Sequence, residues 1–214
     1  TQSPITLPVP QISYTIEQVL QIKQLDRLIV STDSIEISEI GRQFGAEVPF
    51  LRPKELASDS SSDFAVVMHL LKWLEKNENY LFDMVVYLRP TCIFRKIKLI
   101  EKAILKGSSV NFDSIRAISL SKHTPYWMFR LNGDFLTPLL NQDDNLKRRQ
   151  DLPDVYQPNG TFEIIKRRTL VEGKTLHGEK QGYIIDNEYA TLDIDTEFDF
   201  RLAEEQYKIL LNKS

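Results

Sequence analysis

The chain has 214 residues, of which 42% are hydrophobic and 27% are charged, and its formal net charge is −3. This composition is typical of a globular protein large enough for one well-buried α/β domain and a smaller appendage. The weakly acidic balance argues against nucleic acid or an anionic membrane as a partner, and no apolar run reaches the roughly 18 residues of a membrane span. The single Cys92 excludes an internal disulfide and predicts a reducing, cytoplasmic environment.

Helix and strand patterns alternate from the start of the chain. Residues 12–24 are typical of a helix, and the short β-branched run 27–32 is typical of a strand. Ser34 then offers an N-cap to a second helix, and Gly45 supplies its end. A third helix is predicted at residues 63–79, where apolar side chains recur at helical spacing.

The alternation continues through the middle of the chain. Residues 84–88, "MVVYL", form a continuous apolar run of the kind found in strands buried on both faces. A helix at about 96–106 and a strand at 114–121 come next. This order predicts an α/β fold with a Rossmann-like, mostly parallel sheet and helices on both faces. Ligands of such sheets bind beyond the carboxyl ends of the strands. Here those ends carry Asp33, residues 52–63 and residues 89–95.

The alternation stops between residues 123 and 160. Asn132-Gly133 is a strong signal for a hairpin turn between two aromatic-rich runs, and a polar stretch rich in proline and asparagine comes after it. Because the hairpin is too short to form its own core, we expect its aromatic side chains to pack against a second subunit. The chain is therefore divided into an α/β domain, residues 1–122 and 161–214, and a dimerisation insertion, residues 123–160.

Regular structure is expected to resume after the insertion and to end in an acidic segment and a helix. Residues 189–200 read "YATLDIDTEFDF", and Thr196 with Asp199 could cap the final helix. If the segment is a strand, Asp193 and Asp195 point to the same face. Two like charges side by side cost free energy unless a positive charge lies between them. A solvated edge and a bound divalent cation would both explain the pair.

Five segments, in this order along the chain, resemble the cytidylyltransferases that activate sialic acids and related nonulosonic acids as CMP-sugars. They are "IVSTDS", "FGAEVPFLRPKELASDSSS", "YLRPTCIFR", "RRQDLPDVYQPNGTFEI" and "DIDTEFDFRLAEE". The resemblance runs from Ile12 to Tyr207. It implies that CTP and an acidic nine-carbon sugar give a CMP-sugar and pyrophosphate, in a homodimeric enzyme that uses Mg²⁺. In this family an acidic pair near the end of a late strand holds the Mg²⁺, and the matching residues are Asp193 and Asp195.

The resemblance also implies a sugar-binding segment. Arg149, Gln150 and Asn159 match it, and a guanidinium group suits the sugar carboxylate because it can bind both oxygens. Without the resemblance, the basic run would be a solvated loop, and Asp151 could tie its arginines into a local salt bridge. Arg89, at a predicted strand end, could contact phosphate or the sugar acid, or be a surface charge at the entry of a helix.

A further loop of this family approaches the nucleotide base. The matching residues here are Arg52, Ser58 and Ser62, which are therefore expected to bind the nucleotide. The serines could equally form an N-cap cluster for the helix that starts near Asp63.

The resemblance does not include the glycine-rich loop with which these enzymes normally begin. Residues 7–18, "LPVPQISYTIEQ", resemble the family segment that comes directly after that loop. In the family, backbone amides, an arginine and a lysine of the loop bind the triphosphate. Each lost charge-assisted hydrogen bond costs about 1.5–3 kcal/mol, so CTP binding would weaken by orders of magnitude. This leaves two hypotheses: an active synthetase, or a catalytically weak binding or assembly subunit.

We expect residues 1–214 by themselves to be a poor catalyst. Pyrophosphate release from CTP and a sialic acid, measured with and without a grafted glycine-rich loop, tests this expectation. Equally fast release from both proteins would contradict it.

Overall fold

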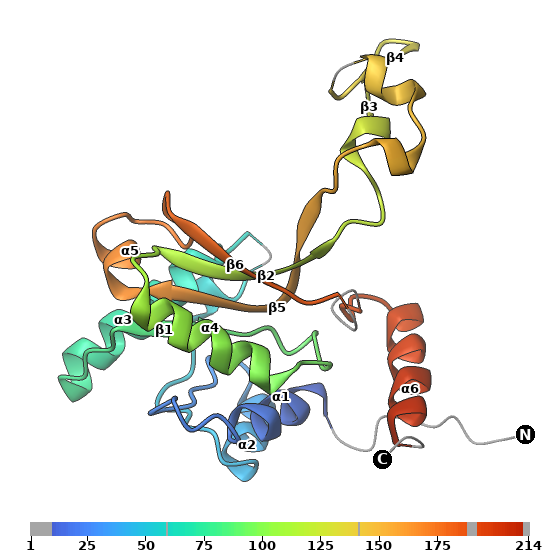
Figure 1. The fold of residues 1–214 in the computed structure, drawn as a ribbon. Coiled ribbons are helices and arrows are strands. Elements are labelled where there is room, and N and C mark those ends of the chain that lie inside the picture. The colour runs from blue at the N-terminus through green and yellow to red at the C-terminus, as the bar shows by residue number, and fades with distance from the viewer. Residues whose placement is uncertain (1–9, 59, 141, 188–191, 212–214) are drawn as a thin grey trace, which may run out of the picture.

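The computed structural model describes residues 10–58, 60–140, 142–187 and 192–211 (Figure 1). A central sheet has helices on both faces, a narrow arm projects from it, and the last helix lies beside the body. The predicted α/β class is confirmed. Of the helices in the described part of the chain, none combines the length and the apolar character that a membrane span requires.

The helices begin where local capping signals predict. Ser34 and Ser62 accept hydrogen bonds from the backbone N–H groups of Ile37 and Ala65, and so cap two helices. Asn79, in the left-handed conformation, ends the second of these. The α-helices are α1 (Gln11–Val19), α2 (Ile35–Gln43), α3 (Asp63–Glu78), α4 (Ile97–Ser109), α5 (Arg167–Val171) and α6 (Glu197–Leu211). The 3₁₀ turns are η1 (Lys54–Leu56), η2 (Pro125–Trp127), η3 (Gln142–Leu146) and η4 (Arg149–Asp151).

The main sheet is mixed. Its strands are β1 (Met84–Tyr87), β2 (Ser114–Leu120), β5 (Tyr156–Lys166) and β6 (Gln181–Ile185), in the order β1-β5-β2-β6. β2 and β6 are parallel, whereas β5 is antiparallel to both of its neighbours. Thus β1, β2 and β6 run in one direction and β5 runs in the other. β5 returns from the arm that β2 leads into, and a connection of that kind reverses the chain direction.

The predicted strand at residues 27–32 forms no ladder in the described structure. It makes a single parallel bridge, between Ile29 and Glu47. The hydrophobic core is instead built on the two faces of the sheet. Neighbouring residues of β5 serve opposite faces: Ile164 packs in the cluster with α4, and Ile165 packs in the cluster with α3 and α5. A third cluster joins α6 and Ile194 to α1 and the loop that precedes α4.

The arm carries the predicted hairpin. Strands β3 (Phe129–Asn132) and β4 (Phe135–Pro138) pair across Asn132-Gly133, and Gly133 has φ of 58°. The hairpin stands away from the sheet (Figure 1). Its large apolar side chains are exposed, among them Leu131 (83%) and Phe135 (77%). We expect such a surface to be covered by a partner.

Candidate active site

Asp193 lies against strand β5. Its atom Oδ1 is fully buried and accepts no hydrogen bond from the described residues. Gly160 of β5 has φ of +74°, and a Cβ atom built on it would lie 3.7 Å from Asp193 Oδ2. Since glycine adopts this backbone conformation without strain and adds no side chain, it lets the carboxylate approach the strand. An anionic oxygen held in a buried place without a donor suits a cation ligand.

Asp195 occupies a different environment. It is exposed beside the first turn of α6, where Thr196 and Asp199 form the predicted capping box. The Asp199 carboxylate accepts a hydrogen bond from the Thr196 N–H at 2.9 Å. Residues 192–195 do not form the strand predicted for the acidic segment, and the Ile194 N–H donates to the Thr91 carbonyl at 3.2 Å. Residues 188–191 lie outside the described part of the chain.

Arg95 is a buried, positively charged residue that interacts electrostatically with Asp193. Its Nε donates to the Thr161 carbonyl at 2.7 Å and its Nη1 donates to Thr15 Oγ1 at 2.8 Å, while Nη2 donates to the Arg89 carbonyl. Burial lowers the pKa of Arg95 to about 10, although the charges of Cys92 and Asp193 act in the opposite direction. The guanidinium group thus joins β5, α1 and the end of β1, and it partly balances the Asp193 carboxylate.

Asn159 is buried on β5 next to Gly160. Its Oδ1 accepts hydrogen bonds from the Thr161 N–H at 3.2 Å and from Thr161 Oγ1 at 2.7 Å, and its Nδ2 donates to the Asp186 carbonyl at 3.3 Å. Asp186 is itself only 4% exposed. These bonds hold β5 beside the chain that leaves β6, and Asn159 directly precedes Gly160, the residue that lies near Asp193.

Arg89 and Tyr87 both contact Asp63, the first residue of α3. Arg89 forms an ion pair with Asp63, and the Tyr87 hydroxyl donates to Asp63 Oδ1 at 2.9 Å. The Arg89 guanidinium also lies over the Tyr87 ring, 5.8 Å from its centroid. The Arg89 side chain is 46% exposed, so a bound anion could reach it.

Replacing Tyr87 by phenylalanine should reduce the fall in the free energy of unfolding that occurs at alkaline pH. Burial first, and then the Asp63 carboxylate, raise the pKa of Tyr87 from 10.0 to about 12. The unfolded state therefore releases the proton first, and the free energy of unfolding falls as the pH rises from 10 to 12. Allowing for solvent screening, this fall is roughly 1–2 kcal/mol. Urea unfolding at pH 8 and pH 11 measures it. Tyr183→Phe, at an exposed tyrosine, is the control, and equal pH dependence in the wild type and Tyr87→Phe would refute the assignment.

The predicted nucleotide-binding residues lie on the connection between α2 and α3. Arg52 Nη2 is 3.8 Å from Asp33 Oδ1, and the Arg52 backbone N–H donates to the Thr32 carbonyl at 2.7 Å. Ser62 serves as the N-cap of α3, and the exposed Ser58 hydroxyl shares hydrogen bonds with neighbouring serine hydroxyls. In this structure Ser62 therefore acts as a helix cap, which is the alternative that the sequence left open. Arg52 lies at the carboxyl end of the 27–32 segment.

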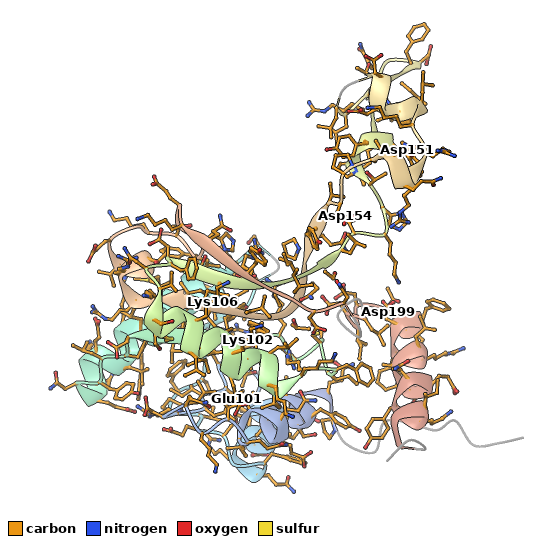
Figure 2. The ribbon with its side chains drawn as sticks, viewed as in Figure 1. Glu101, Lys102, Lys106, Asp151, Asp154 and Asp199 are labelled. Carbon is orange, nitrogen blue, oxygen red and sulfur yellow. The ribbon has the colours of Figure 1, made fainter. Side chains whose placement is uncertain are left out.

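The predicted sugar-binding residues Arg149 and Gln150 lie on the arm. Both are exposed, and Arg149 Nη2 donates to the Ser121 carbonyl at 3.0 Å. Asp151 forms an ion pair with Arg148, as the local alternative predicts for this basic run. Figure 2 shows Asp151 well up the arm and Asp199 at the start of α6, so the arm segment and the start of α6 are separate in one chain.

The structure thus places Asp193 against Gly160, the residue after Asn159, and it places Arg52 and Arg89 around one cavity. It leaves Arg149 and Gln150 on the arm. Three further polar residues surround Arg95 and Asn159 and are marked by no local sequence motif: Thr15, Thr161 and Asp186. Only the fold brings them to this place.

The residues near Asp193 fit a magnesium ion. Among the described residues, no three or more His, Cys, Asp or Glu side chains are arranged to hold a metal. Mg²⁺ needs no such cluster, because it usually keeps several waters and takes one or two carboxylates together with phosphate oxygens. The partly buried Asp193 carboxylate, whose Oδ1 accepts no hydrogen bond from the described residues, is of the type that meets this requirement, whereas Asp195 is exposed in a different environment.

Three proteins of known sequence are similar to this chain over most of its length. The chain is 31% identical over 198 residues to CMP-N,N'-diacetyllegionaminic acid synthase of Legionella pneumophila, covering 91% of this chain and 84% of that protein. It is 31% identical over 196 residues to N-acylneuraminate cytidylyltransferase of Escherichia coli, covering 91% of this chain and 45% of that protein. It is 28% identical over 205 residues to pseudaminic acid cytidylyltransferase of Campylobacter jejuni, covering 94% of this chain and 86% of that protein.

A solved structure has a similar fold. CMP:2-keto-3-deoxy-manno-octonic acid synthetase, solved with CTP, superposes with a TM-score of 0.68 at 10% identity, over 96% of this chain and 90% of that one. The model of the cytidylyltransferase family matches residues 8–213. With nearly the whole chain matched, this chain belongs to the cytidylyltransferase family of nucleotidyltransferase enzymes.

Proposed function

We propose that the chain transfers the cytidylyl group of CTP to an acidic nine-carbon sugar of the nonulosonic type. The anomeric hydroxyl oxygen forms a bond to the α-phosphorus, and the bond from that phosphorus to the β-phosphate bridging oxygen breaks. Pyrophosphate leaves, and the hydroxyl proton is lost to solvent. Catalysis of this kind depends on positioning and on neutralising charge. The names of the relatives, which act on legionaminic, neuraminic and pseudaminic acids, support this class of acceptor.

Asp193 is the residue on which the proposal chiefly rests. We propose that Asp193 and Asp195 hold Mg²⁺, which would neutralise charge on the phosphates when bound. The buried Oδ1 of Asp193, without a hydrogen bond from the described residues, supports this role. Arg95 keeps the backbone around it in place and limits the negative potential of the Asp193 carboxylate.

Arginine side chains are proposed to bind the two substrates. Arg52 and Arg89 line one cavity and face the nucleotide, with Ser58 and Ser62 on the same loop region. Arg149 and Gln150 bind the sugar acid, because an exposed guanidinium group can hold both carboxylate oxygens. Asn159 belongs to the sugar site through its amide, of which one N–H has no bond within the described residues.

Pyrophosphate release from CTP with legionaminic, neuraminic and pseudaminic acids tests the function. We expect release with one or more of these acids and none when ATP or GTP replaces CTP. Calorimetry of CTP binding with and without Mg²⁺ separates an active synthetase from a catalytically weak subunit. Tight Mg²⁺-dependent binding without release would favour the weak subunit, and neither binding nor release would contradict both.

The arm is proposed to form a homodimer. Its exposed apolar side chains support this arrangement, and a second chain would cover them. The dimer would also place the arm segment with Arg149 close to another body. We further propose that the reaction takes place in the cytoplasm, in line with the single reduced Cys92.

Substituting Leu131 and Phe135 together by glutamate should convert the dimer to a monomer. Both side chains are more than three-quarters exposed, so the single chain tolerates the charges, whereas a dimer interface would have to bury them. Light scattering after gel filtration gives the mass. Leu105→Glu, on the exposed face of α4, is the control and should leave the mass unchanged. A double variant that stays dimeric rules out the arm as the interface.

A further inference from the structure

Asp63 is the first residue of α3, and the cap of that helix is supplied by its neighbour Ser62, which accepts from the Ala65 N–H at 3.2 Å. The Asp63 carboxylate is directed instead to the carboxyl end of β1. Its Oδ1 accepts from the Tyr87 hydroxyl at 2.9 Å, and its Oδ2 accepts from the Arg89 guanidinium group. Both carboxylate oxygens therefore join the start of α3 to the end of β1. The N-terminus of a helix favours a negative side chain, so the charge of Asp63 is well placed there.

Arg89 is held at its main chain and at its side chain. Its carbonyl accepts from Nη2 of Arg95, whose guanidinium group is itself bonded to β5 and α1. Its own guanidinium group pairs with Asp63 and lies over the Tyr87 ring, 5.8 Å from the centroid. A free arginine side chain has many rotamers, and contacts at these points restrict it to a few of them. The direction of the Arg89 side chain is thus set before any ligand arrives.

Part of the Arg89 guanidinium group is left for a ligand. Asp63 accepts from Nη2, and the described residues offer no hydrogen-bond acceptor to Nε or Nη1. The side chain is 46% exposed and lines the cavity of about 650 Å³ that Arg52 also lines. Asp63 lies outside the lining of that cavity. A guanidinium group binds an anion through two N–H groups in a fixed geometry, so its orientation matters for affinity.

We propose that Asp63 is a positioning residue for nucleotide binding, because it holds the Arg89 guanidinium group in the orientation that meets the nucleotide. The proposal rests on the assignment of Arg89 to the nucleotide under the proposed function. The negative charge of Asp63 also repels an anionic ligand. That repulsion is screened by water, since both side chains of the pair are more than a third exposed. Orientation is not screened, so it is the larger effect.

Steady-state kinetics of two Asp63 variants test the proposal. Asp63→Asn keeps the shape of the side chain and removes its charge, so we expect the KM for CTP to rise about tenfold. The kcat and the KM for the sugar acid should change less than about twofold, because the lost interaction concerns nucleotide binding alone. Asp63→Glu keeps the charge and should recover most of the affinity for CTP. Glu36→Gln, at an exposed acid in the first turn of α2, is the matched control and should leave all three constants unchanged.

Nitrogen-15 relaxation of the Arg89 Nε–H group gives a second readout that needs no nucleotide. We expect its order parameter to fall from about 0.8 in the wild type to below about 0.6 in Asp63→Asn. Arg201, which is 73% exposed on α6, is the internal control and should be mobile in both proteins. The two readouts separate the two proposals. An inactive wild type whose Arg89 is ordered by Asp63 would refute cytidylyl transfer and not the positioning of Arg89.

Other outcomes overturn the positioning role. An unchanged KM for CTP or an unchanged order parameter in Asp63→Asn would show that Arg89 needs no help from Asp63. A lower KM for CTP would show that Asp63 competes with the nucleotide for Arg89. A rise in the KM for the sugar acid alone would assign the pair to the other substrate. Equal losses in all three constants, together with a lower free energy of unfolding, would show that Asp63 only stabilises the fold.

Discussion

Replacing Asp193 by asparagine should lower the rate of CMP-sugar formation by a factor of about 100 or more. Asparagine keeps the shape of the side chain and removes its charge, and Mg²⁺ binds carboxylate oxygens in preference to neutral ones. Because Asp193 Oδ1 is buried without a hydrogen bond from the described residues, neutralising it should not destabilise the fold. The variant should therefore keep its free energy of unfolding while it loses activity.

Two measurements separate the metal role from a structural one. Pyrophosphate release gives the rate, and calorimetry gives the dependence of CTP affinity on Mg²⁺. Asp193→Asn should lose that dependence, and Asp195→Asn should weaken it less, since Asp195 is exposed. Glu197→Gln, with a 76% exposed side chain nearby in the sequence, is the matched control. If Asp193→Asn keeps the wild-type response to Mg²⁺, the proposed metal site is wrong.

Replacing Arg95 by glutamine should destabilise the protein by about 2–3 kcal/mol. The guanidinium group donates to Thr161, Thr15 and Arg89, and each acceptor would lose a charge-assisted bond. Part of the loss is offset, because burial already disfavours the charged guanidinium group, as its lowered pKa shows. The loss of its charge also leaves Asp193 less balanced, so we expect the affinity for Mg²⁺ to rise while the fold becomes weaker.

Urea denaturation at neutral pH measures this destabilisation. The control is Arg201→Gln on α6, where the arginine is 73% exposed and, among the described residues, pairs with Glu197 four residues earlier. Exposed pairs of this kind contribute about 0.5 kcal/mol or less. Should Arg95→Gln and Arg201→Gln destabilise equally, Arg95 would not be the residue that joins β5, α1 and the end of β1.

Features set by neighbouring residues were predictable from the sequence. The caps at Ser34 and Ser62, the turn at Asn132-Gly133 and the Thr196–Asp199 box all form as the local patterns indicate. They depend on bonds that span only a few residues, so composition and spacing are enough. The strand at 84–87 was also predictable, since a continuous apolar run has few other places in a globular protein.

Features that depend on distant segments were not predictable. The direction of β5 cannot be read from its own residues, because the same β-branched run suits a parallel or an antiparallel neighbour. The segment 27–32 has strand-like residues, but its pairing depends on which backbone lies beside it, and it makes only one bridge.

By itself, the sequence determined the α/β class, the positions of the helices and hairpin, and, through ordered motifs, the cytidylyltransferase family. Only the tertiary structure decided that Asp193 is partly buried against Gly160 while Asp195 is exposed, and that β5 runs antiparallel to both of its neighbours. The physical reason is the separation along the chain over which each kind of interaction acts. Capping and hydrophobic periodicity act over a few residues, whereas burial and the pairing of backbone groups are set by segments that folding brings together from across the chain.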